Sequence, residues 1–104
     1  MVMGATPYVR GVRFEYRVRD YLSSRGYIVL RSPRSGGPID LVAIRSGEVL
    51  FIQCKTSKYD MTRREAYELI ELARSVNAKP ILAYRDPKPP YKIRLENLYN
   101  IGGG

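Results

Sequence analysis

The chain has 104 residues, enough for one small domain that buries roughly two thirds of its extended surface and too few for a two-domain enzyme. Its composition, 44% hydrophobic and 27% charged, is typical of a globular protein and excludes a disordered or fibrous chain. A net charge of +8 favours a polyanionic partner such as nucleic acid, although a solvated basic face is the alternative.

The residue types that the sequence lacks exclude several kinds of chemistry. It contains no His and only one cysteine, Cys54, which excludes an internal disulfide, a Cys/His zinc site and a His-dependent triad. Any catalysis must therefore use carboxylates, Lys, Tyr or a metal held by oxygen ligands. No segment approaches the ~20 apolar residues of a membrane span, and Met1 to Thr6 lacks the features of a secretory signal. We therefore expect a cytoplasmic protein with no membrane contact.

The first half of the chain predicts one helix followed by three strands. Apolar residues recur at helical spacing from about Val9 to Arg25, and Gly26 ends this first helix. Three β-rich runs follow, and a turn at Ser46 and Gly47 joins the last two as a hairpin. The predicted strands span residues 27–31, 39–45 and 49–56.

The second half predicts one further helix and two short strands. Thr62 and Glu65 have the spacing of a capping box, which opens a helix that ends near Val76. The two strands are expected at residues 80–84 and 91–95. This order predicts a single α/β domain over residues 1–104, with a central mixed β-sheet flanked by helices.

Polar residues converge in the predicted hairpin. If its loop is the two residues Ser46 and Gly47, antiparallel pairing places Asp40 directly opposite Gln53. Gln53 and Lys55 are two positions apart, so both project from the same face of the sheet. The residues expected on the opposite face are Leu50, Ile52 and Cys54, the last as a buried hydrophobe rather than a nucleophile. A three-residue or bulged turn would shift this register by one.

An oxygen-rich site beside a lysine is what a Mg²⁺-dependent phosphodiesterase requires. Asp40 and the amide oxygen of Gln53 are hard ligands, and Lys55 could orient a water nucleophile or stabilise charge on the phosphate. Glu15, at the border of the apolar stripe of the first helix, could add a second carboxylate. As alternatives, Glu15 could form a surface ion pair with Arg19, Asp40 could merely end a loop, and Lys55 could be solvated.

One residue and three short segments, within about Gly11 to Tyr84, carry a resemblance to a known family. They are Glu15, residues 31–37 (RSPRSGG), residues 38–43 (PIDLVA) and residues 51–56 (FIQCKT). Together they resemble the archaeal Holliday junction resolvases of the PD-(D/E)xK nuclease superfamily. This resemblance implies a restriction-endonuclease-like fold, a homodimer, a need for Mg²⁺ with Mn²⁺ as a substitute, and paired nicks in a four-way DNA junction.

The resemblance also implies roles for individual residues. Glu15, Asp40 and Gln53 correspond to the metal ligands, and Lys55 to the family's lysine. Ser35 corresponds to a serine that lies near the scissile phosphate, which completes the catalytic set. The basic residues expected to hold the DNA backbone are Arg10, Arg13, Arg31, Arg34 and Lys58.

Two positions depart from the family pattern. Gln53 stands where the family has Glu, which removes one negative charge and should weaken Mg²⁺ binding. Tyr16 stands where a basic residue commonly follows the helix Glu, although Arg10, Arg13 and Arg17 lie within a turn or two. The first departure leaves open a catalytically silent protein that binds junctions or duplex DNA. A further alternative is a nuclease of the same fold that acts on flaps, single strands or unspecific duplex. For self-association, the pattern suggests an apolar face formed by Leu82, Tyr84, Tyr91 and Ile93.

Overall fold

The computed structural model describes residues 6–32 and 37–100. Within these ranges the chain forms two α-helices, five β-strands and two short 3-10 turns, in the predicted order. The elements are α1 (Pro7–Ser24), β1 (Ile28–Arg31), β2 (Leu41–Arg45), β3 (Glu48–Lys55), α2 (Arg63–Ser75), β4 (Lys79–Arg85) and β5 (Ile93–Asn97), with 3-10 turns at Lys58–Asp60 and Leu98–Asn100. Neither described helix is long and apolar enough to cross a membrane.

Capping interactions set the ends of both helices. The Thr6 hydroxyl accepts a hydrogen bond from the Val9 N–H (3.1 Å), and Pro7 occupies the first turn, so α1 begins two residues earlier than apolar spacing predicts. After α1, Gly26 adopts φ of 90°, a conformation that glycine tolerates best. The predicted capping box at Thr62 and Glu65 is confirmed, with both of its hydrogen bonds formed.

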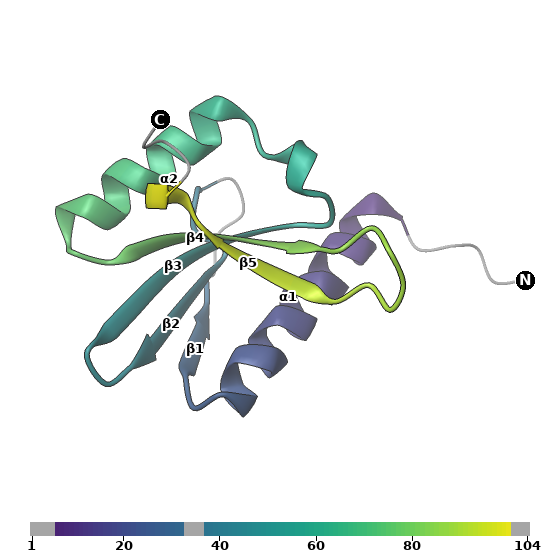
Figure 1. Ribbon diagram of the computed structural model, residues 1–104, viewed down its shortest axis with the longest axis horizontal. Coiled ribbons are helices and arrows are strands. Elements are labelled where there is room, and N and C mark those ends of the chain that lie inside the picture. The colour runs from purple at the N-terminus through teal and green to yellow at the C-terminus, as the bar shows by residue number, and fades with distance from the viewer. Residues whose placement is uncertain (1–5, 33–36, 101–104) are drawn as a thin grey trace, which may run out of the picture.

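The five strands form one mixed sheet in the order β1-β2-β3-β4-β5, as the fan of arrows in Figure 1 shows. β3 and β4 are parallel and joined through α2, while the other neighbouring pairs are antiparallel. Arg45 pairs with Glu48, which confirms the predicted two-residue hairpin loop between β2 and β3. The mixed α/β architecture predicted from the sequence is therefore confirmed.

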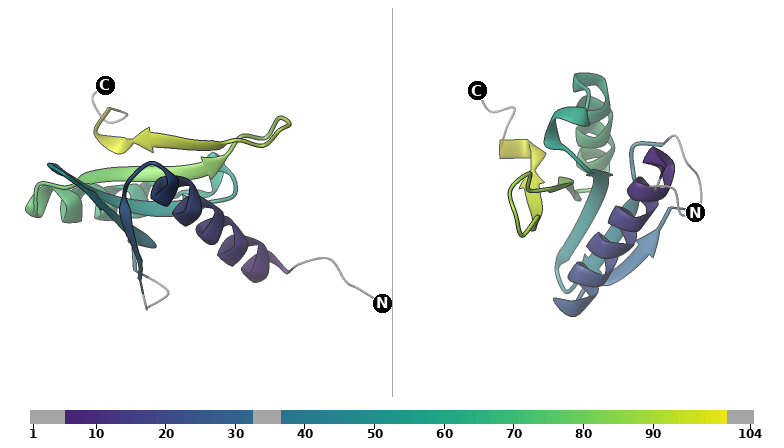
Figure 2. Two further views of the ribbon diagram at one scale, coloured as in Figure 1. Left: turned by 90° about the horizontal axis from the view of Figure 1, so that it is seen from below. Right: turned by 90° about the vertical axis from the view of Figure 1, so that its right-hand side faces the viewer.

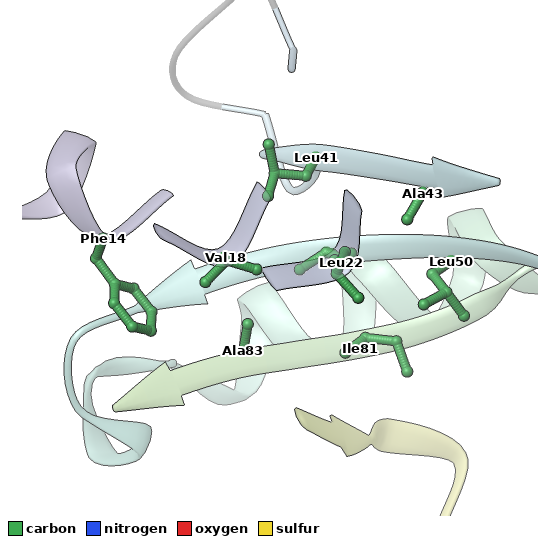
Figure 3. Packing of buried hydrophobic residues seen from close by; sticks show 9 residues of the cluster. Phe14, Val18, Leu22, Leu41, Ala43, Leu50, Ile81 and Ala83 are labelled. Atoms are coloured by element: carbon green, nitrogen blue, oxygen red, sulfur yellow. The ribbon is translucent and has the colours of Figure 1, made fainter. Parts of the chain in front are cut away.

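Each helix covers a different face of the sheet. α1 runs obliquely to β4 and β5 (Figure 2), and its buried side chains Phe14, Val18 and Leu22 point at the strands (Figure 3). On the other face, Leu69 of α2 packs with Leu82 and Leu98. The strand residues that pack with α1 are Leu41, Ala43, Leu50, Ile52, Ile81 and Ala83, with Cys54 at the border. The alternation predicted for β3 is therefore confirmed.

The prediction of an apolar face for self-association is wrong. Leu82 is only 3% exposed, because it forms part of the core beneath α2. Tyr84 packs on the α2 side of the sheet, whereas Ile93 packs against the cluster on the α1 side. Alternation along β4 and β5 therefore separates residues that the sequence pattern had grouped together.

Candidate active site

Asp40 lies immediately before β2, and β3 fixes its position. Its N–H donates to the Ile52 carbonyl (2.8 Å), and its Oδ2 accepts a hydrogen bond from the Cys54 N–H (2.7 Å). The pairing of β2 with β3 has the predicted register and ends at Leu41 and Ile52, so Asp40 lies just beyond the regular pairs, on the side of Gln53. The carboxylate reaches past Gln53 to the backbone of β3.

The environment of Asp40 strongly affects its ionisation. Burial raises the pKa of its carboxyl from 3.8 to about 6, and the negative charges of Glu15 and Glu65 add to the rise. The hydrogen bond from the Cys54 N–H and the charge of Lys55 oppose this rise. Ionised Asp40 is thus destabilised at neutral pH, and a nearby cation would relieve that cost.

Gln53 is almost completely buried, with 5% of its surface exposed. Among the described residues, no donor reaches its side-chain oxygen Oε1, which is itself buried. A buried acceptor with no partner typically costs about 1–3 kcal/mol. Such an orphaned oxygen beside Asp40 needs an explanation, and a hard cation is a suitable partner for it.

Lys55 is held by a carboxylate from α2. Its Nζ lies 3.0 Å from Oε2 of Glu65, and Oε1 of the same carboxylate accepts the Thr62 N–H at 2.8 Å. Although burial of Glu65 opposes the change, its hydrogen bonds from Thr62 and Lys55 leave its pKa below the usual value. The alternative that Lys55 is simply solvated at a strand end is wrong, because it is half-buried and paired.

Glu15 lies on α1 and reaches towards β1. Its Oε1 is 3.1 Å from Nε of Arg31, whose guanidinium also lies 5.0 Å from the centre of the Tyr16 ring. The alternative pairing of Glu15 with Arg19 is wrong, since Arg19 pairs with Asp20. The charge of Glu15 raises the pKa of Asp40, so the two carboxylates interact across the end of the sheet.

Cys54 has no features of a nucleophile. Burial raises the pKa of its thiol, and the charges of Asp40 and Glu15 raise it further. In residues 6–32 and 37–100, no three His, Cys, Asp or Glu side chains form a group suited to a metal ion. An oxygen site at this end of the sheet would therefore combine the carboxylates with the Gln53 amide.

The predicted DNA-binding residues lie on several elements. Arg10 and Arg13 are exposed on α1, and Arg31 is exposed at the end of β1, where Glu15 engages it. Lys58 lies in the 3-10 turn after β3, with its Nζ 5.8 Å from the centre of the Tyr84 ring. The remaining two predicted site residues, Ser35 and Arg34, fall outside the described residues.

Sequence reasoning missed two residues near this end of the sheet. Glu65 was identified only as a helix cap, and its pairing with Lys55 depends on how α2 docks on β3. Arg85 has no local signal, because it joins the α1 arginines only through the tertiary fold.

Comparisons of this chain with a family model, a curated protein and a solved structure all point to the same family. The model of the archaeal Holliday junction resolvase (Hjc) family matches residues 6–100. The crossover junction endodeoxyribonuclease Hjc of Methanocaldococcus jannaschii is 37% identical over 81 residues, which are 75% of this chain and 60% of that protein. The structure of Archaeoglobus fulgidus Hjc, described as a Holliday junction resolvase from an archaeal hyperthermophile, matches with a TM-score of 0.71. That match has 25% identity and covers 86% of this chain and 74% of the other.

Proposed function

This chain belongs to the archaeal Holliday junction resolvase family, and we propose that it is a metal-dependent endonuclease that makes paired nicks in four-way DNA junctions. The chain spans 60% of the length of its curated relative. The observation that carries the proposal is the buried, unpartnered Oε1 of Gln53, which lies in β3 between Ile52 and Cys54, the two residues that hydrogen-bond with Asp40. A net charge of +8 supports DNA as the substrate.

The donor atoms of this site fit a divalent cation. The Cys54 N–H orients Asp40 through Oδ2, which leaves its other oxygen for a ligand, and Gln53 offers Oε1. Glu15 is the third candidate ligand, because its charge interacts with that of Asp40. Mg²⁺ and Mn²⁺ prefer such oxygen ligands, and the bound cation would stabilise negative charge on a phosphate and make a water more acidic.

The chain's own residues supply the remaining parts of the reaction. Lys55 would orient the attacking water for in-line displacement or neutralise charge on the phosphate oxygens. Glu65 fixes the Lys55 ammonium at 3.0 Å, so the lysine is positioned before any substrate arrives. Arg31 lies exposed beside Glu15, where it would contact the DNA backbone.

A homodimer is part of the proposal, because two nicks in opposed strands require two sites related by symmetry. An open, mostly apolar groove of about 790 Å³ between α2 and the end of β5 supports self-association. Tyr67 is 64% exposed at this groove. Its apolar lining residues are Met61, Ala66, Tyr67, Ile70, Leu82 and Leu98.

A strand-labelled cleavage assay tests the proposed function. The substrates are a four-way junction and a linear duplex of matched sequence, each with Mg²⁺ or with EDTA, and the proteins are wild type and Asp40→Ala. We expect symmetric, metal-dependent nicks in the junction alone and no nicks with Asp40→Ala. Cleavage in EDTA, or full activity of the variant, would contradict the proposal.

The same assay separates the two alternatives. A silent binder would bind the junction without cutting it, and Gln53→Glu would restore cleavage by returning the missing charge. A nuclease for other structures would cut a flap or a single strand faster than the junction. Gln53 lacks the negative charge of the Glu that the family has at this position. This difference favours the silent binder over the nuclease for other structures.

A further inference from the structure

Four arginines surround a pocket of about 550 Å³ between α1 and the ends of β3 and β4. Three of them lie on α1, spaced by successive helical turns. Phe14, which also lines the pocket, packs into the core. The fourth is the last residue of β4. The lining residues are Arg10, Arg13, Phe14, Arg17, Thr56 and Arg85.

In the part of the chain that the structure describes, these arginines have no acidic partners. Ion pairs engage Arg19, Arg31, Arg45, Arg64, Arg74 and Arg94 elsewhere in the fold. Among the described residues, none of the four pocket arginines forms an ion pair with a carboxylate. Four like charges around one hollow repel each other and create a positive potential that an anion would neutralise.

Tyr91, in the loop between β4 and β5, orients two of the four arginines. Its carbonyl accepts a hydrogen bond from Nη2 of Arg17 (2.5 Å), and its ring centre lies 5.3 Å from the guanidinium of Arg85. Tyr91 itself adopts φ of 58°, and its N–H donates to the Lys88 carbonyl (2.8 Å). This loop therefore holds the Arg17 and Arg85 side chains in place in the absence of a ligand.

The pocket adjoins the candidate active site. Thr56 directly follows Lys55, and Arg85 directly follows Tyr84, the residue paired with Lys55 in the parallel strands. Lys55 lies on the α2 face of the sheet, so alternation puts Thr56 on the α1 face, where the arginines lie. A DNA strand at Lys55 would reach the pocket by passing around the end of the sheet.

We propose that this pocket binds successive phosphates of the DNA strand that continues from the cleaved phosphodiester, with Arg85 as the contact that the sequence does not predict. The proposal rests on the proposed function, since it takes DNA as the substrate. Guanidinium groups bind phosphate oxygens in paired hydrogen bonds, and the hydroxyl of the half-buried Thr56 in the pocket lining can add another. From Arg10 to Arg17 the helix rises ~10 Å, so the arginines are spread over a length that can contact more than one phosphate.

Salt-dependent binding of a four-way junction in EDTA tests the pocket without cleavage. We expect Arg85→Gln to weaken binding about tenfold and to make the slope of log K against log salt shallower by about one, because one phosphate contact is lost. Arg74→Gln is the matched control, since Arg74 carries the same charge but pairs with Glu71 on α2. Arg85→Lys should recover most of the slope, because it keeps the charge.

The outcomes distinguish the two proposals. A larger change in slope for Arg85→Gln than for Arg74→Gln supports the pocket. Equal changes in the two variants, with tight junction binding by wild type, would overturn the pocket and leave the proposed function standing. If wild type binds the junction no better than a linear duplex, the selectivity for junctions in the proposed function fails, and the slopes measured on duplex still decide the pocket.

Discussion

Replacing Asp40 with Asn is expected to stabilise the folded protein above neutral pH while it abolishes cleavage. The folded structure raises the pKa of Asp40 from 3.8 to about 6. The contribution of this group to stability is therefore complete below pH 4 and is lost as the pH rises through about 6. A pKa rise of this size corresponds to about 3 kcal/mol in the free energy of unfolding. Solvent access to the half-buried carboxylate reduces this contribution to about 1–2 kcal/mol.

Asn is the informative replacement because it removes the charge and keeps an acceptor for the Cys54 N–H. Urea unfolding in EDTA at pH 4, 6 and 8 measures the effect. The stability of Asp40→Asn relative to wild type should grow with pH, and added Mg²⁺ should stabilise wild type alone. Equal stabilities at pH 8, or a difference that is the same at pH 4 and pH 8, would refute the reasoning about burial.

Three further predictions concern the site and the proposed dimer. Gln53→Glu should lower the Mg²⁺ concentration for half-maximal cleavage at least tenfold, because it restores a ligand charge; an unchanged metal titration would contradict this. Glu65→Gln keeps the helix cap but frees Lys55, so kcat should fall about tenfold with KM unchanged. If Glu65 has a purely structural role, the variant would show only a lower melting temperature. Tyr67→Lys should shift the protein to monomer in light scattering, and an unaltered mass would exclude the α2 groove as the interface.

Most of the fold could be predicted because its signals are local. The apolar spacing of α1, the capping box of α2 and the two-residue turn at Ser46 and Gly47 each specify an element from a few neighbouring residues. The turn also sets the register of β2 against β3, which in turn brings Asp40 close to Gln53 and Lys55. The type of chemistry at the site was therefore accessible from the sequence.

The remaining details depend on contacts between distant segments. The orientation of Asp40 depends on the bonds that its N–H and its carboxylate both form with β3, which no hairpin rule specifies. The pairing of Lys55 with Glu65 requires the crossover through α2 to be in place. Burial of Leu82 depends on α2 covering one face of β4, and alternation alone does not reveal which face is covered.

The Glu65 carboxylate accepts the hydrogen bond from the Thr62 N–H that caps α2, and it also restrains the Lys55 ammonium. Fraying of the first turn of α2 would release Thr62 and Glu65 together and leave the Lys55 ammonium free to move. Helix ends open far more readily than whole domains unfold, so this local event has its own, lower free energy. On heating, turnover should therefore decline before the sheet melts, and amide exchange at Glu65 should report the loss.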